Sequence, residues 1–376
     1  MSHVNRVIEV GLIGFGNAGQ LYHAPFLNAI EGFRLTKVRT SRPLSERTRN
    51  ALPAYTQVVG NNEDILTDPA IELVVVAAPN DLHYSLAKAA LEAGKHVVVD
   101  KPFTLSVAEA DELIAVAEAR QRTLTVYHNR RFSSDFRTLK KVCESGLLGR
   151  IVEFEAHFDR FRNSIRQDSW KEENKPGAGV FYDMAPHLID QALQLFGQPH
   201  ELRADLRAQR TGSPVVDNFE VVLLYPDLKV TLKGGMLAKD PFPQFAVFGD
   251  QGSFVKYGRD MQEDALRADS VPYTSPGWGT EPESFWGRLL TNFKGLEMNA
   301  TVKSEPGDYG AFYRNLHQVL TANGELLVLP QQARDVIYLI ELAEQSNQEK
   351  RTLPVVPHMP VVAHMPLGAA AVPATY

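Results

Sequence analysis

The sequence predicts an α/β fold of two parts, in which an N-terminal doubly wound parallel sheet precedes a C-terminal α+β domain with a large, mostly antiparallel open sheet. Three observations predict this arrangement. The apolar run VIEVGLI, which starts at Val7, ends in the glycine-rich segment GFGNAG. Strand-like and helix-like patterns then alternate as far as Tyr127, as a parallel sheet with crossover helices requires. Beyond Phe132, strand-like runs follow one another through short connections rich in Gly, Pro and Asp, which favours antiparallel pairing.

The length of the chain indicates more than one domain. With 376 residues it exceeds the size at which a single core keeps growing, about 250 to 300 residues. We expect one domain over residues 1–127, a second over 128–351 and a tail over 352–376. The tail has no Asp, Glu, Lys or Arg, and its prolines exclude a helix. We expect a loosely ordered end or, because the segment is apolar, an extended arm across a neighbouring subunit.

The N-terminal part alternates regularly after its first strand. Further strands are expected over 33–39, 71–78, 96–99 and 124–127, and helices over 18–30, 61–66, 81–93 and after Ser106. The strand at 71–78 contains the run LVVV, which is typical of a strand buried on both faces. Ser106 and Glu109 have the spacing of a capping box, which predicts the start of the last helix.

The C-terminal part has a different pattern of expected strands and helices. Strands are expected over 151–161, 219–225, 229–234, 244–249 and 253–257, and helices over 135–145, 183–196, 309–323 and 333–344. A glycine-rich loop over 176–179 precedes the helix at 183–196. Long helices do not separate the four later strands, so the second sheet is expected to be mostly antiparallel.

Composition excludes several classes of protein. The 39 basic and 45 acidic residues, net charge −6, give no electrostatic reason to expect nucleic acid or an anionic membrane as partner. No apolar run approaches the roughly 20 residues that cross a bilayer, and the first strand begins too early for a signal peptide, so we expect a cytoplasmic protein. The single cysteine, Cys143, excludes an internal disulfide and multi-cysteine metal sites, and no metal site is expected.

The glycine segment has the spacing G-x-G-x-x-G of a Rossmann dinucleotide-binding loop. In such a loop Gly14 allows the tight turn, Gly16 lets the backbone approach a pyrophosphate, and Gly19 lets the next helix pack against the strand. The helix N-terminus then offers N–H groups to phosphate oxygens. Three glycines in six residues also occur in ordinary turns, so the motif needs support from elsewhere. The expected cofactor loop consists of Gly14, Phe15, Gly16, Asn17, Ala18 and Gly19.

The end of the second strand predicts which dinucleotide binds. The free ribose 2′-hydroxyl of NAD usually hydrogen-bonds to an acidic residue about 20 residues after the glycines. The 2′-phosphate of NADP binds instead to an arginine or a small hydroxyl side chain. Here Ser41 and Arg42 occupy the position, and no Asp or Glu occurs before Glu46. We therefore expect NADP, with NAD as the alternative. Arg42 could instead be an ordinary solvated loop arginine.

Other strand ends should line the same crevice, because ligands of doubly wound sheets bind outside the carboxyl ends of the strands. The residues at these ends are Ala78, Pro79, Asn80, Asp100, Lys101 and Asn129. Lys101 would place an ammonium group there. Asp183 and His187 are four residues apart and share one face if the segment is helical. Each of these reactive groups could be structural if taken singly, and only their combination with a cofactor loop favours catalysis.

One motif is rejected. Tyr84 and Lys88 have the Y-x-x-x-K spacing of short-chain dehydrogenases, but no serine lies at a sensible distance upstream, where Ile71 stands instead. We expect Tyr84 and Lys88 to lie on a helix surface.

The sequence resembles the Gfo/Idh/MocA oxidoreductase family, whose usual E-K-P reads D-K-P at residues 100–102. The segments APNDLHYSLAKAALEAGKHVVVDKPFT, VYHNRRFSSDF, EAHFDRFR and GVFYDMAPHLIDQALQLFG are similar to a branch that includes NADP-dependent scyllo-inositol dehydrogenases. The resemblance implies a Rossmann domain followed by an α/β domain whose open sheet packs in homodimers or homotetramers. It also implies catalytic roles for Lys101, Asp183 and His187, and places Asn80, His83, Asn129 and Trp170 around the nicotinamide and the substrate.

The expected reaction is hydride transfer between NADP and a secondary alcohol or ketone of a cyclic polyol or sugar. His187 would take the hydroxyl proton, Lys101 would stabilise the alkoxide, and Asp183 would orient the imidazole or bind a substrate hydroxyl. Candidate polyol contacts are Asn129, His157, Asp159, Arg160 and Arg166, of which we favour Arg160 because strand alternation puts it on the opposite face from His157 and Asp159. The alternatives are a reductase of another aldehyde, keto-sugar or imine-like substrate, and a sensor of the same fold that binds the dinucleotide without turnover.

Overall fold

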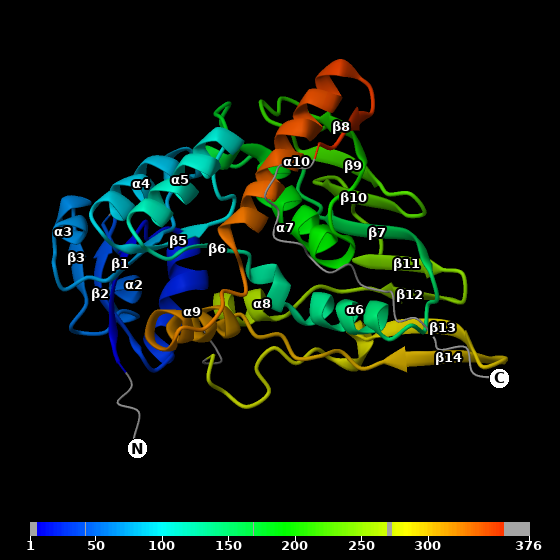
Figure 1. Ribbon diagram of the computed structural model, residues 1–376, viewed down its shortest axis with the longest axis horizontal. Helices are drawn as coiled ribbons and strands as arrows, with labels where there is room; N and C mark the ends of the chain where they lie inside the picture. The colour runs from blue at the N-terminus through cyan, green and yellow to red at the C-terminus, as the bar shows by residue number, and fades with distance from the viewer. Residues whose placement is uncertain (1–5, 42, 168, 269–272, 357–376) are drawn as a thin grey trace.

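The computed structural model describes residues 6–41, 43–167, 169–268 and 273–356, and it contains two sheets that lie side by side (Figure 1). The first sheet has the strand order β3-β2-β1-β4-β5-β6, and all its neighbouring strands are parallel. Its strands are β1 (Ile8–Ile13), β2 (Phe33–Arg39), β3 (Gln57–Val59), β4 (Leu73–Val76), β5 (His96–Asp100) and β6 (Leu124–Tyr127). The predicted doubly wound sheet is confirmed, and the strand order reverses between β1 and β4.

Helices cover both faces of the first sheet. They are α1 (Ala24–Ala29), α2 (Glu46–Asn50), α3 (Glu63–Leu66), α4 (His83–Glu92) and α5 (Val107–Ala119). Helices α4 and α5 pack against each other, whereas α9 (Gly310–Ala322) returns from the far end of the chain and contacts α1 (Figure 1). Phe312 and Tyr313 of α9 share a core with Val10 and Leu12 of β1. This double coverage explains why all four residues of β4 are buried.

The second sheet has the order β14-β13-β12-β11-β7-β10-β9-β8-β15, in which β7 and β10 are the parallel pair. Its strands are β7 (Ile151–Asp159), β8 (Glu201–Arg207), β9 (Asn218–Leu224), β10 (Lys229–Gly235), β11 (Phe245–Gly249), β12 (Gly252–Lys256), β13 (Gly287–Phe293), β14 (Leu296–Val302) and β15 (Leu353–Pro354). The other neighbouring strands are antiparallel, which confirms the predicted α+β domain with a mostly antiparallel sheet.

The two faces of the second sheet differ. Helices α7 (Gly179–Phe196) and α10 (Pro330–Glu349) pack against one face, with α6 (Ser134–Glu144) beside α7 (Figure 1). Apolar side chains on strands β11, β13 and β14 are exposed; they are Phe248, Leu290, Phe293, Leu296 and Met298. By the strand register Phe248 and Leu290 lie on one face and Phe293, Leu296 and Met298 on the other, so apolar side chains are exposed on both faces at this end of the sheet.

Two predicted helices differ from the structure in detail. The helix expected over 18–30 contains a π-helical segment, η1 (Gly19–His23), before α1. The helix expected from Asp183 begins at Gly179, inside the segment that we expected to be a loop. Gly179 has φ +89°, and a Cβ there would lie 2.6 Å from the Val216 carbonyl oxygen, so this glycine permits a sharp entry into α7. The predicted start of α5 is confirmed, because Ser106 Oγ accepts from the Glu109 amide.

Several short elements were not predicted. They are β3, β8, β13, β14, β15, α2 and α8 (Gln262–Ala268). Strands β13 and β14 form a hairpin whose turn, Lys294 and Gly295, has positive φ at both residues. Strand β15 lies within the segment expected to be a tail and pairs with β8. The rest of that segment, 357–376, lies outside the described residues.

Among the described helices, none is both long and apolar enough to span a membrane. The domain boundaries at 127 and 351 stay predictions. Helix α9 follows the second sheet in sequence but packs on the first, so sequence order and spatial grouping differ for this helix.

Candidate active site

The glycine loop has the geometry that a dinucleotide requires. Gly14 has φ +98°, and a Cβ there would lie 2.4 Å from the Ala77 carbonyl oxygen. A Cβ on Gly19 would lie 2.2 Å from the Gly14 carbonyl oxygen, because the following helix sits directly on the turn. A Cβ on Gly16 would meet no atom within 4 Å. The loop is thus closed on its inner side and open at Gly16, where backbone can approach a pyrophosphate, so these residues fit a dinucleotide.

The rest of the predicted cofactor loop surrounds that opening. Phe15 is buried and Asn17 is exposed. Gln20 donates through Nε2 to the Phe15 carbonyl oxygen at 2.8 Å, which ties the first turn of the helix to the loop. Ser41 is exposed just beyond β2. Arg42, the predicted partner of a 2′-phosphate, lies outside the described residues.

His83 holds two strand ends together. Its Nδ1 lies 2.7 Å from the Pro102 carbonyl oxygen and its Nε2 lies 2.9 Å from the Ala78 carbonyl oxygen. Burial lowers the pKa of His83, so the ring is neutral and donates one of these two hydrogen bonds. The side chain is 1% exposed. His83 is therefore buried among backbone groups of two strand ends, and its place near the nicotinamide stays a prediction.

Asn80 links the first sheet to the segment before α7, and Asp100 links the end of β5 to the helix after the glycine loop. Asn80 Nδ2 donates to the Gly177 carbonyl oxygen at 2.8 Å, just before α7. Asp100 Oδ1 accepts from the Lys101 amide at 2.9 Å and lies 3.8 Å from His23 Nε2 in the helix after the glycine loop. Burial raises the pKa of Asp100, but His23 and Lys101 together lower it by more, so the pKa lies below its usual value. The end of β5 is thereby tied to the glycine loop on one side and leads to Lys101 on the other.

Lys101 and Asp183 meet across the gap between the two sheets. Lys101 Nζ donates to the Asp183 carbonyl oxygen at 2.7 Å and to Asp183 Oδ1 at 3.2 Å. A second ammonium, Lys171 Nζ, lies 2.7 Å from the same Oδ1. Burial raises the pKa of Asp183, but the charges of Lys171 and Lys101 outweigh it and hold that pKa well below its usual range. Burial lowers the pKa of Lys101 despite the neighbouring carboxylate.

His187 lies one turn after Asp183 on α7, as predicted. Burial, together with the charges of Lys101 and Arg130, holds the pKa of His187 well below its usual value, so the imidazole is neutral near pH 7. Its Nδ1 is buried and has no hydrogen-bond partner within the described chain. Among the described residues, the hydrogen bonds to the Asp183 carboxylate come from two lysines, both at Oδ1, and not from His187. The imidazole is held instead by burial and by the ring of Phe158, whose centroid lies 6.4 Å away.

Two arginine side chains make cation–π contacts with the ring of Phe158. The guanidinium carbon of Arg130 lies 5.0 Å from its ring centroid and that of Arg160 lies 5.2 Å away. Burial lowers the pKa of Arg160, and its Nε is buried without a partner in the described chain. His157 Nδ1 lies 3.3 Å from Asp159 Oδ2, so these two side chains point away from Arg160 as strand alternation predicts.

The loop that carries Trp170 is held by buried charges. Glu172 accepts from Arg210 Nη2 at 2.6 Å, and Arg210 Nε donates to Asp217 at 2.8 Å. This network fixes the 3₁₀ turn Trp170–Glu172 and thereby presents Lys171 to Asp183. Arg166 is exposed on the same loop. Sequence reasoning missed Lys171, because no spacing in the sequence links it to α7.

Asn129 and the two arginines after it lie inward. Asn129 is 6% exposed and starts a 3₁₀ turn at the end of β6. Arg131 donates to both carboxylate oxygens of Asp190 at 2.8 and 2.5 Å, and Arg130 Nη2 lies 3.2 Å from Glu263. Both arginines are buried, so neither forms part of a basic surface.

Tyr84 and Lys88 form a separate contact at the surface. Both donate to Glu112 on α5 at 2.6 Å, which confirms the interpretation that they lie on a helix surface. Among the described residues, no group of three His, Cys, Asp or Glu side chains has an arrangement that could hold a metal ion.

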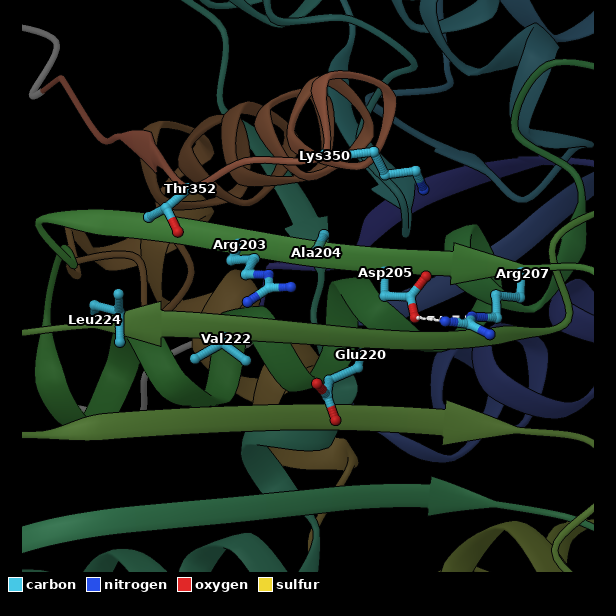
Figure 2. A pocket seen from close by; sticks show the side chains of 9 residues that line it. All are labelled: Arg203, Ala204, Asp205, Arg207, Glu220, Val222, Leu224, Lys350 and Thr352. Atoms are coloured by element: carbon cyan, nitrogen blue, oxygen red, sulfur yellow. Dashed lines mark hydrogen bonds and ion pairs between the residues drawn. The ribbon is translucent and has the colours of Figure 1, made fainter.

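A pocket elsewhere lies on the face of β8 and β9 that α10 does not cover (Figure 2). Its lining is Arg203, Ala204, Asp205, Arg207, Glu220, Val222, Leu224, Lys350 and Thr352. Arg207 pairs with Asp205 there, and none of the predicted catalytic residues contributes to it. None of the strand-end residues predicted to bind the cofactor lines it.

Comparisons with known proteins agree with this architecture. The sequence profile for the NAD-binding Rossmann fold of the GFO_IDH_MocA oxidoreductase family matches residues 8–128, and that for the C-terminal alpha/beta domain matches residues 140–355. The chain is 43% identical over 348 residues to the uncharacterized oxidoreductase YdgJ of Escherichia coli K12, covering 92% of this chain and 98% of that protein.

Two further similarities extend over almost the whole chain. The scyllo-inositol 2-dehydrogenase (NADP(+)) IolW of Bacillus subtilis is 37% identical over 346 residues, covering 92% of this chain and 95% of that protein. A solved structure of an oxidoreductase from Bacillus cereus has a TM-score of 0.85 at 31% identity, covering 94% of this chain and 99% of that one. Since both family profiles match and the similarity is nearly end to end, the chain belongs to the Gfo/Idh/MocA oxidoreductase family, with an NAD(P)-binding Rossmann domain and a C-terminal α/β domain.

Proposed function

We propose that the protein is an NADP-dependent dehydrogenase that transfers a hydride between the nicotinamide and a secondary alcohol or ketone of a cyclic polyol or sugar of the inositol type. The observation that carries this proposal is the contact between Lys101 and Asp183, with His187 one turn further on α7, beside the strand ends that adjoin the glycine loop. Similarity to an NADP-dependent scyllo-inositol dehydrogenase supports the substrate class and the cofactor.

His187 is the proposed base for alcohol oxidation. Its lowered pKa keeps the imidazole neutral, so it can accept the hydroxyl proton at neutral pH. The buried Nδ1 without a partner leaves hydrogen-bonding capacity at the ring. When bound, the nicotinamide supplies hydride transfer chemistry.

Lys101 is the proposed electrostatic partner of the reacting oxygen. An ammonium group in a buried setting stabilises a developing alkoxide more strongly than one in water. Asp183 holds this ammonium in place and opposes the effect of burial on the pKa of Lys101, which is a different role from orienting the imidazole. Lys171 shares the carboxylate and so completes the charged side of the site.

The other proposed contacts are with the cofactor and with the substrate. The proposed cofactor contacts are Gly14, Phe15, Gly16, Asn17, Ala18, Gly19, Ser41, Arg42, Ala78, Pro79, Asn80, His83, Asp100, Lys101 and Asn129. The proposed substrate contacts are Lys101, Asn129, Arg160, Trp170, Asp183 and His187. Arg160 is favoured as a substrate contact because its buried Nε has no protein partner within the described chain. We propose further that the exposed apolar end of the second sheet joins subunits into a homodimer or homotetramer.

The proposal is tested by mixing the purified protein with NADP and a panel of cyclic polyols and sugars and following the absorbance of the reduced cofactor. We expect turnover with an inositol-like polyol and slower turnover with NAD. Binding of the dinucleotide without turnover of any polyol, sugar, aldehyde, keto-sugar or imine would instead indicate a sensor of the same fold.

A further inference from the structure

Helix α8 brings a cation from the second half of the chain to the glycine loop. This helix contacts η1, the segment that follows the glycines, and lies between the two sheets (Figure 1). Arg267 Nη1 donates to Asn17 Oδ1 at 3.3 Å. Asn17 occupies a variable position of the G-x-G-x-x-G motif, so the guanidinium stands at the rim of the loop. The Arg267 side chain is 44% exposed, which leaves it accessible to a ligand.

A buried carboxylate fixes the direction of this guanidinium. Arg267 donates to Glu263 Oε1 through Nε at 3.1 Å and through Nη2 at 2.8 Å. Arg130 Nη2 lies 3.2 Å from the other oxygen of Glu263. Burial raises the pKa of Glu263, but Arg130 and Arg267 together lower it by more, so the pKa is about 2. Two guanidiniums thus share one ionised carboxylate beside the loop, and Arg130 also faces the carboxyl groups of Asp135 and Asp260.

The helix itself is firmly anchored. Gln262, at its start, is fully buried. Gln262 Oε1 accepts from the Tyr309 amide at 2.8 Å and from Trp278 Nε1 at 2.9 Å. These contacts join α8 to the start of α9, which packs on the first sheet. Arg267 is therefore presented by a fixed element.

We propose that Arg267 binds the pyrophosphate of the dinucleotide, so that the second half of the chain closes the cofactor site opposite the glycine loop. This inference rests on the cofactor part of the proposed function. A guanidinium has five N–H donors, more than the contacts to Glu263, Asn17 and Tyr22 use, and its fork matches phosphate oxygens. The loop is open at Gly16, next to Asn17, where the pyrophosphate is expected. The glycine loop supplies backbone N–H groups, and Arg267 adds the charge that this loop lacks.

The test measures equilibrium binding of NADPH and NADH, by cofactor fluorescence or calorimetry, to the wild type and to Arg267→Gln. Losing a charge-assisted contact to phosphate should weaken binding of both dinucleotides by about 10-fold to 100-fold. Arg267→Lys should recover part of the affinity, because it restores the charge without the fork. Raising the salt concentration should weaken binding more in the wild type than in Arg267→Gln.

Arg150→Gln is the matched control. Arg150 is an exposed arginine paired with Asp250 at 3.6 Å before β7, and its loss should leave both affinities unchanged. Thermal unfolding of each variant, together with the Arg267→Lys rescue, separates a lost contact from a misfolded chain. Unchanged affinity in folded Arg267→Gln would refute the proposal, and so would a loss confined to NADPH, which would indicate the 2′-phosphate instead. Wild-type binding without turnover would refute the proposed dehydrogenase while leaving this inference standing.

Discussion

The glycine loop and the reactive cluster differ in how they are built. The loop is six consecutive residues whose function depends on backbone conformation and on the absence of side chains at Gly14 and Gly19. The cluster joins residues that are far apart in sequence, such as Lys101, Lys171 and Asp183, and its function depends on charge and burial. Changes in the loop should therefore act through strain and cofactor affinity, whereas changes in the cluster should act through turnover.

The largest effect should come from the base. We expect His187→Ala to lower turnover by about 100-fold to 10,000-fold, because a positioned general base contributes about that much. The affinity for NADPH should change by less than a factor of about 3, because the charges that hold Lys101 remain. Steady-state kinetics and cofactor binding measure the two separately. His200→Ala, at an exposed histidine before β8, is the control, and a loss of less than about tenfold in His187→Ala would exclude this base.

The loop should respond in the opposite way. In Gly14→Ala a Cβ would collide with the Ala77 backbone at a positive φ, so the free energy of unfolding should fall by about 2 to 4 kcal/mol. Gly16→Ala, where a Cβ has open space, should change the free energy of unfolding by less than about 0.5 kcal/mol and should weaken NADPH binding. Urea unfolding and cofactor titration distinguish the pair. Equal stability of the two variants would contradict the distinction between closed and open sides of the loop.

A pH effect should be intermediate in size. Burial lowers the pKa of His128 to about 4, although Asp190 lies 3.8 Å from its Nδ1. The charges of Arg131 and Lys101 act in the same direction as burial. Since the unfolded chain binds a proton below pH 6.5 and the folded chain does not, stability is lost as the pH falls through that range.

At pH 5 the expected cost is about 2 kcal/mol in the free energy of unfolding. His128→Gln should remove this share of the pH dependence, which urea unfolding at pH 7 and pH 5 would show. His200→Gln, at an exposed position, is the matched control. The same slope in His128→Gln as in the wild type would mean that the His128 ring is protonated in the folded protein.

The smallest expected effect concerns cofactor choice. Arg42→Asp should shift the ratio of NADP to NAD affinity by about tenfold toward NAD, because an acidic residue accepts from a ribose hydroxyl and repels a 2′-phosphate. Binding titrations with both dinucleotides measure this ratio. No change in the ratio would place the 2′-phosphate contact on another residue.

Local patterns were enough to predict much of the fold. The strand with the LVVV run, the capped start of α5 and the Asp183 and His187 spacing were predicted because each depends on residues near one another in sequence. Strands β8, β13 and β14 were missed because their mixed side chains become strand only when neighbouring strands supply hydrogen bonds. The π-helical segment after the glycines leaves no sequence signal that distinguishes it from an α-helix.

Sequence patterns were enough to predict the glycine loop, the alternation of strands and helices in the first half apart from β3 and α2, and Lys101, Asp183 and His187 as candidates. Three features depend on the packing of distant segments: His83 contacts two strand ends, Asp183 contacts two lysines and not the imidazole, and α8 brings Arg267 to the loop. The physical reason is that a turn or a helix face follows from the covalent spacing of neighbouring residues. A contact between distant segments depends instead on how two sheets pack together, and it is that packing which sets the burial and the charge around each group.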